Sequence, residues 1–452
     1  MQNIHKTLIL LFLLALSYLS ASTWEPPMTV STAGADTTYA VTIASDDNAN
    51  AALAWTQSGE VYSSYRPFGG GWEPPHSHGK GKDIQICMDG SGNITVAFIQ
   101  DDGTSDLVRT DFRPAGGVWV GAVTRYTAAT VNTLTELAIH CIRDNFYGMI
   151  AWLDQSGTDP VVHTLSRQGN GTGWSSFGVV AINDPSNNTV TAGTAPIPRI
   201  QSNGTSVCLL KTTNTGTVQV NYASFNIATL TATSTWNPAP GTPLPDLGFS
   251  GGVFGTPPER FDFDMNRNGN AVVGVSTFND QVAAAVSTNA SSSWTTPVLV
   301  DPNPSKWVEA AIDNFGFATL AWIQAAPANI STASTSVFAP SWVWIIQQIG
   351  SINTVPSLNS SPNGGSVLAW DDGSADLNAK VGFQGDFETP PVLVDLNSKV
   401  ESVSMSNRGV AFAAWLDAST GLVEASRTIV EAQNLINVLG KKRLIYQKGL
   451  YP

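Results

Sequence analysis

The chain has 452 residues and a formal net charge of −13 at pH 7, with 42% hydrophobic and only 13% charged residues. This hydrophobic fraction is sufficient for a folded core and excludes a disordered chain. The negative charge repels phosphate groups and other polyanions, which disfavours nucleic acids and anionic sugars as ligands.

The first 22 residues have the three parts of a secretory signal peptide. Lys6 provides the positive charge, residues 8–19 form an apolar stretch, and Ser20-Ala21-Ser22 offers small residues for cleavage. This stretch is shorter than the roughly 20 apolar residues that a membrane-spanning helix needs. No later segment is long and apolar enough to cross a bilayer. We therefore predict an exported protein (secreted, periplasmic or at the cell surface) without a transmembrane segment after cleavage.

An aromatic residue opens a short strand at intervals of about 45–62 residues through the rest of the chain. Self-similarity on this scale indicates a solenoid, a propeller or another repeat architecture. The eight strand-opening residues are Trp24, Trp72, Trp119, Trp174, Trp236, Trp294, Trp342 and Phe387.

Each repeat is predicted to contain four strands. In the first repeat these are residues 40–45, 51–55, 61–66 and 71–78, separated by turn-forming residues. The second strand is almost continuously apolar, as expected for a strand covered on both faces. It begins with small residues and ends with tryptophan in most repeats, which suits a tapering, radially packed sheet. Related second strands occur at 94–98, 148–152, 317–322, 366–370 and 411–415.

Four antiparallel strands in each of eight repeats predict an all-β fold, a β-propeller spanning residues 23–430. Seven blades is the alternative, because the fourth and fifth repeats are irregular. The chain begins with a fourth-type strand (24–31) and ends with a third-type strand (422–430), so the N-terminal strand is predicted to complete the last blade. Such closure removes exposed sheet edges. The tail, residues 431–452, lies outside the repeats, and we expect a monomer.

The chain contains three cysteines, Cys87, Cys141 and Cys208. An odd number argues against a disulfide framework, and a free cysteine is usually a small buried apolar residue. Cys87 and Cys141 occupy matching places in neighbouring repeats. A bond between them is therefore the alternative to free thiols.

The hairpin at residues 287–294 resembles a degraded Asp-box, the S-x-D-x-G-x-T-W turn of sialidase-like propellers, with Asn289 for Asp and Ser291 for Gly. The repeats as a whole resemble those of secreted bacterial propellers. The resemblance implies the fold but not an activity, because one propeller fold hosts many functions. Sialidases use an arginine cluster, a tyrosine nucleophile with a glutamate partner, and an aspartic acid. These roles cannot be assigned here, since the arginines are scattered: Arg66, Arg109, Arg113, Arg143, Arg167, Arg199 and Arg260.

The connections between second and third strands are acidic and should lie on one face of a propeller, around the channel mouth. Carboxylates from several blades could bind Ca²⁺, a cationic partner or sugar hydroxyls. The alternative is a set of solvated turn residues, because aspartate favours turns. The carboxylates are Asp101, Asp102, Asp106, Asp154, Asp159, Asp280, Asp371, Asp372, Asp376 and Asp417.

Two further features are candidate sites. His76 and His78 form an i, i+2 pair on one strand face, as two metal ligands would, although no third ligand is evident and a polar strand end is the alternative. The long connection at 243–260 contains Phe254 and Arg260, and aromatic residues beside carboxylates suit a carbohydrate. Flexible filler is the alternative there. Residues 264–269 imitate the start of a calcium loop, but Val275 stands where a bidentate acid is needed, which indicates a turn.

These observations favour an exported, non-catalytic propeller that binds a protein or a glycan at the channel mouth, with Ca²⁺ as a possible aid. The alternative is a carbohydrate-active hydrolase or lyase that uses two carboxylates of the same loops, about 5–10 Å apart.

Overall fold

The computed structural model describes residues 23–429 with interruptions. The predicted signal peptide, the tail and Phe254 lie outside the described residues. No helix in the described part is long and apolar enough to span a bilayer. The interruptions are 33–40, 144–145, 158–159, 169–173, 175–179, 183–187, 192–193, 215–216, 230–235, 238–243, 250–257, 278–280, 326–327, 340–344, 352–355, 373–375, 385, 388–391 and 397.

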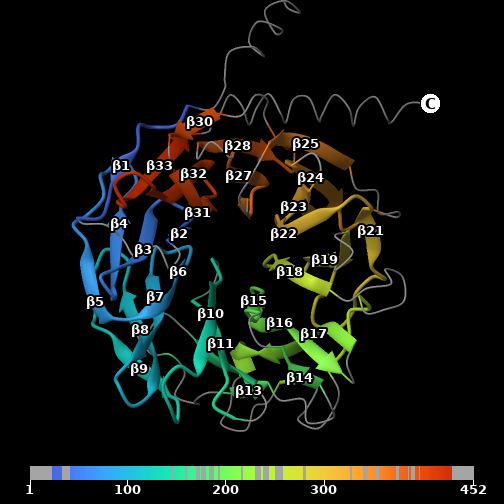
Figure 1. Ribbon diagram of the computed structural model, residues 1–452, viewed down its shortest axis with the longest axis horizontal. Helices are drawn as coiled ribbons and strands as arrows, with labels where there is room; N and C mark the ends of the chain where they lie inside the picture. Colours follow the sequence, from blue (N-terminus) through green and yellow to red (C-terminus); the bar gives the residue numbers. More distant parts are fainter. Residues whose placement is uncertain are drawn as a thin grey trace, which may run out of the picture.

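Eight antiparallel sheets stand around a central axis, with the first strand of each sheet innermost (Figure 1). The strands of blade 1 are β2 (Thr42–Ser45), β3 (Ala51–Gln57), β4 (Glu60–Arg66) and β5 (His76–Lys80); those of blade 2 are β6 (Lys82–Met88), β7 (Ile94–Asp101), β8 (Asp106–Arg113) and β9 (Val123–Thr127); those of blade 3 are β10 (Leu134–Cys141), β11 (Gly148–Asp154), β12 (Val161–Arg167) and β13 (Val180–Ile182); those of blade 4 are β14 (Asn188–Val190), β15 (Ile197–Ile200), β16 (Thr205–Asn214) and β17 (Thr217–Asn226).

The second half of the ring repeats this plan. The strands of blade 5 are β18 (Pro258–Met265), β19 (Ala271–Thr277), β20 (Val282–Ser287) and β21 (Val298–Asp301); those of blade 6 are β22 (Ser305–Ile312), β23 (Phe317–Ala325), β24 (Ala328–Ser336) and β25 (Ile345–Ser351); those of blade 7 are β26 (Ser357–Ser360), β27 (Gly365–Asp371), β28 (Leu377–Phe383), β29 (Asp386–Phe387) and β30 (Val392–Asp395); those of blade 8 are β31 (Ser398–Met405), β32 (Val410–Asp417), β33 (Val423–Ile429) and β1 (Met28–Thr29).

The prediction of an eight-bladed, all-β propeller is confirmed, and the seven-blade alternative is wrong. Blade 4 explains why the count was difficult from sequence. Its innermost position is shared by β14 and β15, which both pair with the long strand β16. On its outer side, the bridges described are those of Asn237 and Asp246 to β17. The fourth repeat is thus a blade with divided edges.

The N-terminal strand closes the ring, as the order of strand types predicts (Figure 1). Met28 pairs with Ala425 and Thr29 with Glu424, in the outermost position of blade 8. Glu25 then accepts hydrogen bonds from Arg427 of blade 8 at 2.8 Å and from Arg66 of blade 1 at 2.7 Å. Both ends of the described chain are therefore held together by sheet pairing and by a shared carboxylate.

The predicted core tryptophans are confirmed. Each lies near the end of a second strand and is at most 1% exposed: Trp55, Trp152, Trp322, Trp370 and Trp415. The apolar residues before them form clusters that cross from blade to blade, and one such cluster joins blades 8, 1 and 2. Because the second strand is covered on both faces, it has no polar side to present to water.

A short polar turn joins the first and second strands and carries its own cap. In blade 5 the Oδ1 atom of Asn266 accepts hydrogen bonds from the backbone N–H groups of Asn268 at 2.9 Å and Asn270 at 3.1 Å. Gly269 has φ +83°, and a side chain there would meet Gln201 at 2.6 Å. The interpretation of residues 264–269 as a turn is confirmed.

The expectation of free thiols is wrong for two of the three cysteines. Cys87 and Cys141 form a disulfide between the first strands of blades 2 and 3, with their Cα atoms 5.6 Å apart. Matching places in neighbouring innermost strands bring two Cα atoms within the 4.4–6.8 Å that a disulfide spans. Cys208 is buried and free, and burial raises the pKa of its thiol.

Candidate functional site

The innermost strands are joined across blades by side chains, because each presents an open sheet edge to the axis. The Oδ2 atom of Asp262 in blade 5 accepts a hydrogen bond from the backbone N–H of Ala310 in blade 6 at 2.7 Å. Asp264 accepts one from Ile312 at 2.9 Å in the same way. These bonds satisfy N–H groups that would otherwise lack a partner.

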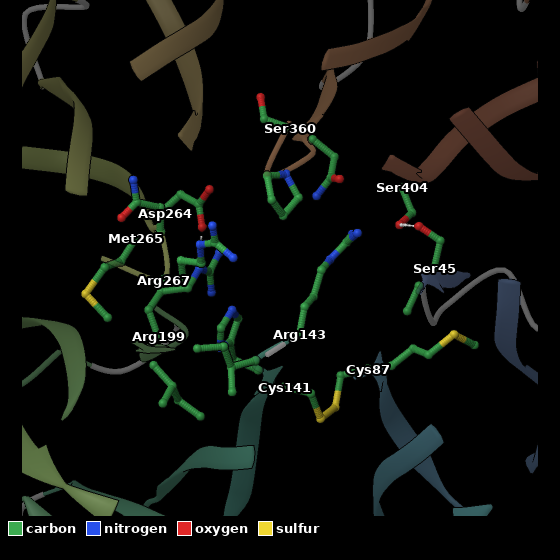
Figure 2. Close-up of a pocket in the computed structure, with 18 of the residues that line it drawn as sticks. Ser45, Cys87, Cys141, Arg143, Arg199, Asp264, Met265, Arg267, Ser360 and Ser404 are labelled. Atoms are coloured by element: carbon green, nitrogen blue, oxygen red, sulfur yellow. Dashed lines mark hydrogen bonds and ion pairs between the residues drawn. A yellow bond between two sulfur atoms is a disulfide. The ribbon is translucent and has the colours of Figure 1, made fainter. Parts of the chain in front are cut away.

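A cavity of about 250 Å³ lies at the end of the axis where the first strands finish, which we call the turn mouth (Figure 2). Arg143, Arg199 and Arg267 line it, together with Asp264 and the Cys87–Cys141 disulfide region. The arginines that lie far apart in sequence are therefore partly gathered by the fold. Arg143 and Arg199 were noted in the sequence as scattered residues, whereas Arg267 was overlooked.

Two of the three arginines are held by contacts with other blades. Arg143 donates to the carbonyl of Met405 at 2.9 Å and lies 3.3 Å from Asp47. Arg199 pairs with Asp264 at 2.9 Å and donates to the carbonyl of Pro198 at 3.0 Å. Burial and these two positive charges hold the pKa of His140 well below its usual value, so that imidazole is neutral. At the turn mouth, Arg143 and Arg199 are therefore each paired with a carboxylate and a backbone carbonyl.

A second cavity, of about 380 Å³, lies at the other end of the first strands, which we call the bulge mouth. Glu136 of blade 3, Arg260 and Asp262 of blade 5, and Trp307 and Glu309 of blade 6 line it. Lys211 of blade 4 contributes to the same wall. Residues from four consecutive blades thus meet at this end.

Irregular strand pairing places two of these side chains. Glu136 lies in the register shift between Thr135 and Ala138, and Trp307 in the shift between Lys306 and Val308. Their φ angles are +57° and +54°. A left-handed conformation costs a non-glycine residue roughly 1–2 kcal/mol, and bulges are used to redirect side chains. The backbone is therefore strained where it presents Glu136 and Trp307 to the cavity.

The carboxyl groups of the bulge mouth are hard to ionise. Burial raises the pKa of Asp262 to about 6, against the opposing charge of Arg199 and the hydrogen bond from Ala310. Burial and then the neighbouring Asp262 raise the pKa of Glu309 well above its usual value. Burial and then Asp83 raise the pKa of Glu136. A carboxyl group that retains its proton can both donate and accept hydrogen bonds.

A cation lies against the aromatic residue of this mouth. The guanidinium carbon of Arg260 is 3.4 Å from the centre of the Trp307 ring, a cation–π contact that holds the ring in place. The mouth therefore combines an ordered aromatic surface, cations on one side and partly protonated carboxyl groups on the other. Such a lining suits a polar ligand with many hydroxyl groups.

Several aspartates predicted from the second-to-third-strand loops accept hydrogen bonds from their own turns. Asp101 is exposed and accepts from the N–H of Gly103 at 2.7 Å. Asp102, also exposed, accepts from the N–H of Ser105 at 2.8 Å. Asp417 accepts from the N–H and the hydroxyl of Ser419, each at 2.7 Å. The turn role explains why aspartate occurs here.

The remaining predicted residues have different surroundings. Asp154 is buried and accepts a hydrogen bond from the Tyr126 hydroxyl at 2.6 Å. Asp371 is buried at the end of β27, and Asp372 is half-buried beside it. Arg260 lines the bulge mouth, whereas none of the predicted aspartates that the structure describes does; Asp159 and Asp280 lie outside the described residues. The ring of loop carboxylates as a Ca²⁺ or ligand site stays a prediction.

Sequence reasoning missed the acidic residues of the first strands. Glu136, Asp262 and Glu309 each lie in a first strand; Asp262 and Glu309 stand between apolar residues, and Glu136 follows a threonine. An acid in the innermost strand of successive repeats was a readable signal. The bulges that direct Glu136 and Trp307 were not readable, because they depend on pairing with the second strand.

The His76–His78 pair lies at the outer edge of blade 1. His78 is buried and His76 is exposed, and Asp111 from blade 2 faces both. The third group that the sequence did not reveal is therefore supplied by a neighbouring blade.

Comparison with known proteins supports the fold and leaves the activity open. The sequence matches no protein family, and no curated protein shows significant similarity to it. The WD40 domain of SCAP from fission yeast aligns with 91% of this chain and 99% of its own, at 8% identity and a TM-score of 0.50. A Hadza microbial sialidase aligns with 82% of this chain and 74% of its own, at 10% identity and a TM-score of 0.43. A variant of the NanB sialidase from Streptococcus pneumoniae aligns with 90% and 71%, at 10% identity and 0.43.

The likeness to propeller repeats with Asp-box-like turns is confirmed. In the hairpin after β20, the N–H of Asn289 donates to Ser287 Oγ at 2.8 Å, and Trp294 Nε1 donates to the carbonyl of Ala290 at 3.0 Å. The Ser287 hydroxyl also bonds the carbonyl of Ser293. The degraded motif thus still closes a tight turn before the fourth strand.

Proposed function

We propose that this protein is an exported, monomeric propeller that binds a glycan at the bulge mouth without chemically changing it. The signal-like residues 1–22 support export. The Cys87–Cys141 disulfide also supports it, because disulfides persist in oxidising compartments.

The proposal rests on one observation: side chains of four blades meet at a 380 Å³ cavity, and two of them are presented from strained backbone. Strain of this kind persists only where the surrounding structure enforces it, and it gathers at functional sites. Cavities of about 300–1,000 Å³ are typical of small-ligand sites. The end of a glycan chain fits this volume better than the flat surface of a folded protein does.

The chemistry of the lining selects a neutral, hydroxylated ligand. Arg260 and Lys211 offset the ionised fraction of Glu136 and Asp262, so neither a strongly anionic nor a strongly cationic ligand is favoured. The protonated carboxyl of Glu309 can donate to one hydroxyl and accept from another. Trp307 provides an apolar surface beside these polar groups.

The test is binding of purified protein to a panel of neutral oligosaccharides, followed by calorimetry on those that bind. Trp307→Ala is expected to weaken binding at least tenfold. Phe338→Ala, which removes an aromatic residue 62% exposed to solvent in blade 6, is the matched control and is expected to bind normally. Equal affinity in both variants, or no binding by the wild type, overturns the proposal.

The same titrations determine whether a cation assists. Binding is repeated with a chelator, with added Ca²⁺, and with Asp371→Asn/Asp372→Asn protein. If the chelator lowers the affinity, and added Ca²⁺ then restores it in the wild type but not in the double variant, the assisting ion is assigned to the loop carboxylates. Identical affinities in every condition remove Ca²⁺ from the proposal.

The hydrolase or lyase alternative is favoured by the raised pKa values of Asp262 and Glu309, which lie beside each other. A glycosidase needs such an acid beside a carboxylate. Each bound oligosaccharide is therefore incubated with the protein and analysed for new chain ends. Products that disappear in Glu309→Gln protein assign catalysis to this pair and refute a purely binding role.

A further inference from the structure

A His–His–Asp cluster lies at the boundary between blades 1 and 2, away from both mouths. His78 Nδ1 is 2.8 Å from Asp111 Oδ2, and His76 Nε2 is 3.9 Å from the same oxygen. The three candidate ligand atoms all lie within 4.8 Å of one another. Two ligands at about 2.1 Å from a tetrahedral ion are about 3.4 Å apart, and this separation lies between the two observed distances.

The surroundings orient each candidate ligand. The second oxygen of Asp111 accepts from the N–H of Phe112 at 2.7 Å and of Gly121 at 2.9 Å, so Oδ2 is the atom turned toward the histidines. His78 Nε2 lies 2.8 Å from the Ser63 hydroxyl. In protein metal sites the second nitrogen of a ligating histidine is held by such a partner, which fixes the tautomer and the ring.

The same part of the fold is built without this cluster in the next blade. In the antiparallel ladder Ser63 pairs with His76, and Thr110 of blade 2 pairs with Val123 at the equivalent step. There, Arg125 Nε donates to the Thr110 hydroxyl at 2.8 Å. One arginine therefore joins the third and fourth strands of blade 2. At the equivalent place blade 1 has two histidines and a carboxylate from blade 2, although blade 2 shows that one side chain is enough to join these strands.

We propose that His76, His78 and Asp111 bind a divalent transition-metal ion, Zn²⁺ in the first instance. Two imidazoles and one carboxylate are a ligand set that Zn²⁺ accepts, and an ion between His78 Nδ1 and Asp111 Oδ2 would replace the proton they share. The side chain of His76 is 44% exposed, which gives the ion a path from solvent.

The cluster also borders a cavity of about 310 Å³, lined by His76, Ser63, Glu73, Arg113 and Trp119. The Trp119 ring stacks on His76 with ring centres 5.7 Å apart and meets His78 edge-on at 4.6 Å. The fourth position of a three-ligand ion would therefore face this cavity. This is the arrangement of a zinc site that keeps one position for water or another small ligand.

The experiment titrates chelator-treated protein with Zn²⁺ in competition with a chromophoric chelator and, separately, with Co²⁺ followed by visible absorption. One ion per chain is expected. His76→Ala and Asp111→Asn are each expected to weaken binding at least about 100-fold and to remove the Co²⁺ spectrum. His163→Gln is the matched control, since His163 lies 3.6 Å from Asp154 without a second histidine, and its affinity should be unchanged.

Circular dichroism and thermal melting of each variant separate loss of the site from loss of the fold. His76 lies at the exposed edge of blade 1, so His76→Ala keeps the test decisive even where Asp111→Asn unfolds the protein. No bound ion in the wild type overturns the proposal. An affinity that His76→Ala leaves within threefold of the wild type overturns it equally.

Discussion

The two ends of the axis are formed by the innermost strands of the same eight blades, but their charged groups have opposite surroundings. At the turn mouth, Arg143 and Arg199 are bound to a carboxylate and to backbone carbonyls, and short capped turns surround them. At the bulge mouth, carboxyl groups are crowded together, and burial raises their pKa values. We interpret this difference as a division of roles: the charges of one end stabilise the ring, and the other end is the one that we propose binds a ligand.

Local backbone conformation points to the same division. The turns of the turn mouth place glycine at most of their left-handed positions, as at Gly269, where the conformation costs little; in blade 1 the residue is Ala49. The bulge mouth places Glu136 and Trp307 in that conformation instead. Substitutions at the two ends should therefore change stability in opposite directions.

The largest effect is expected from the disulfide beside the turn mouth. Cys87→Ser/Cys141→Ser should lower the free energy of unfolding by about 4 kcal/mol, because the bond closes a loop of 54 residues. Chemical denaturation of the oxidised wild type and the double variant measures this difference. The reduced wild type should match the variant. Equal stability in all three samples would contradict a structural role for this end.

The ion pair in the same mouth should give the next largest loss. Asp264→Ala leaves Arg199 without its carboxylate and the N–H of Ile312 without its acceptor, and should cost about 2–3 kcal/mol. The exposed Asp101→Ala is the control and should change the unfolding free energy by less than about 0.5 kcal/mol. If Asp264→Ala proves as stable as Asp101→Ala, the turn mouth is not the stabilising end.

Removal of a carboxyl group from the bulge mouth should instead raise the free energy of unfolding. Because burial raises the folded-state pKa values of Asp262 and Glu309, their contribution to stability is complete below about pH 4. It is lost as pH rises through the folded-state pKa of each group, which is about 6 for Asp262. Glu309→Gln should therefore be about 1–2 kcal/mol more stable than the wild type at pH 8, a value reduced by screening from channel water. The two proteins should converge at pH 4. Thermal melting of both proteins across this pH range measures the difference in stability. A difference that grows toward low pH would contradict raised pKa values at this mouth.

The smallest effect concerns backbone strain. Glu136→Gly removes a side chain from a residue at φ +57° and should raise stability by about 1 kcal/mol while weakening glycan binding. Lys306→Gly, one residue before the bulge in blade 6, is the control and should lower stability slightly. Gain of stability together with unchanged binding would show that Glu136 is strained for a reason other than the ligand.

Much of the fold can be predicted because the residue types of the repeat have direct structural roles. Tryptophan after a run of small apolar residues marks a second strand, and an N-terminal strand of the fourth type implies closure with the last blade. The disulfide was harder to predict. The odd count depends on Cys208, which is simply a small buried residue, and the distance between Cys87 and Cys141 is set by how two blades pack.

The candidate site was predicted only in part, since the sequence indicated an acidic channel mouth and Arg260. The most visible aspartates, such as Asp102 and Asp417, are visible because turns favour them, and they bind their own loops. The positions of Glu136 and Glu309 in first strands can be read from the sequence, but their raised pKa values depend on burial and on acids of other blades. Asp111 likewise meets His78 only because neighbouring blades stand side by side.

The carboxylate of Glu25 has a consequence for how the ring is completed. It bonds arginines that lie 41 and 402 residues away along the chain, so blade 8 can be finished only after the final strand has been synthesised. Until that moment blade 8 lacks its outermost strand, and the ring remains open. A circularly permuted version, with its ends placed in a different hairpin, would shift this last assembly step to another blade.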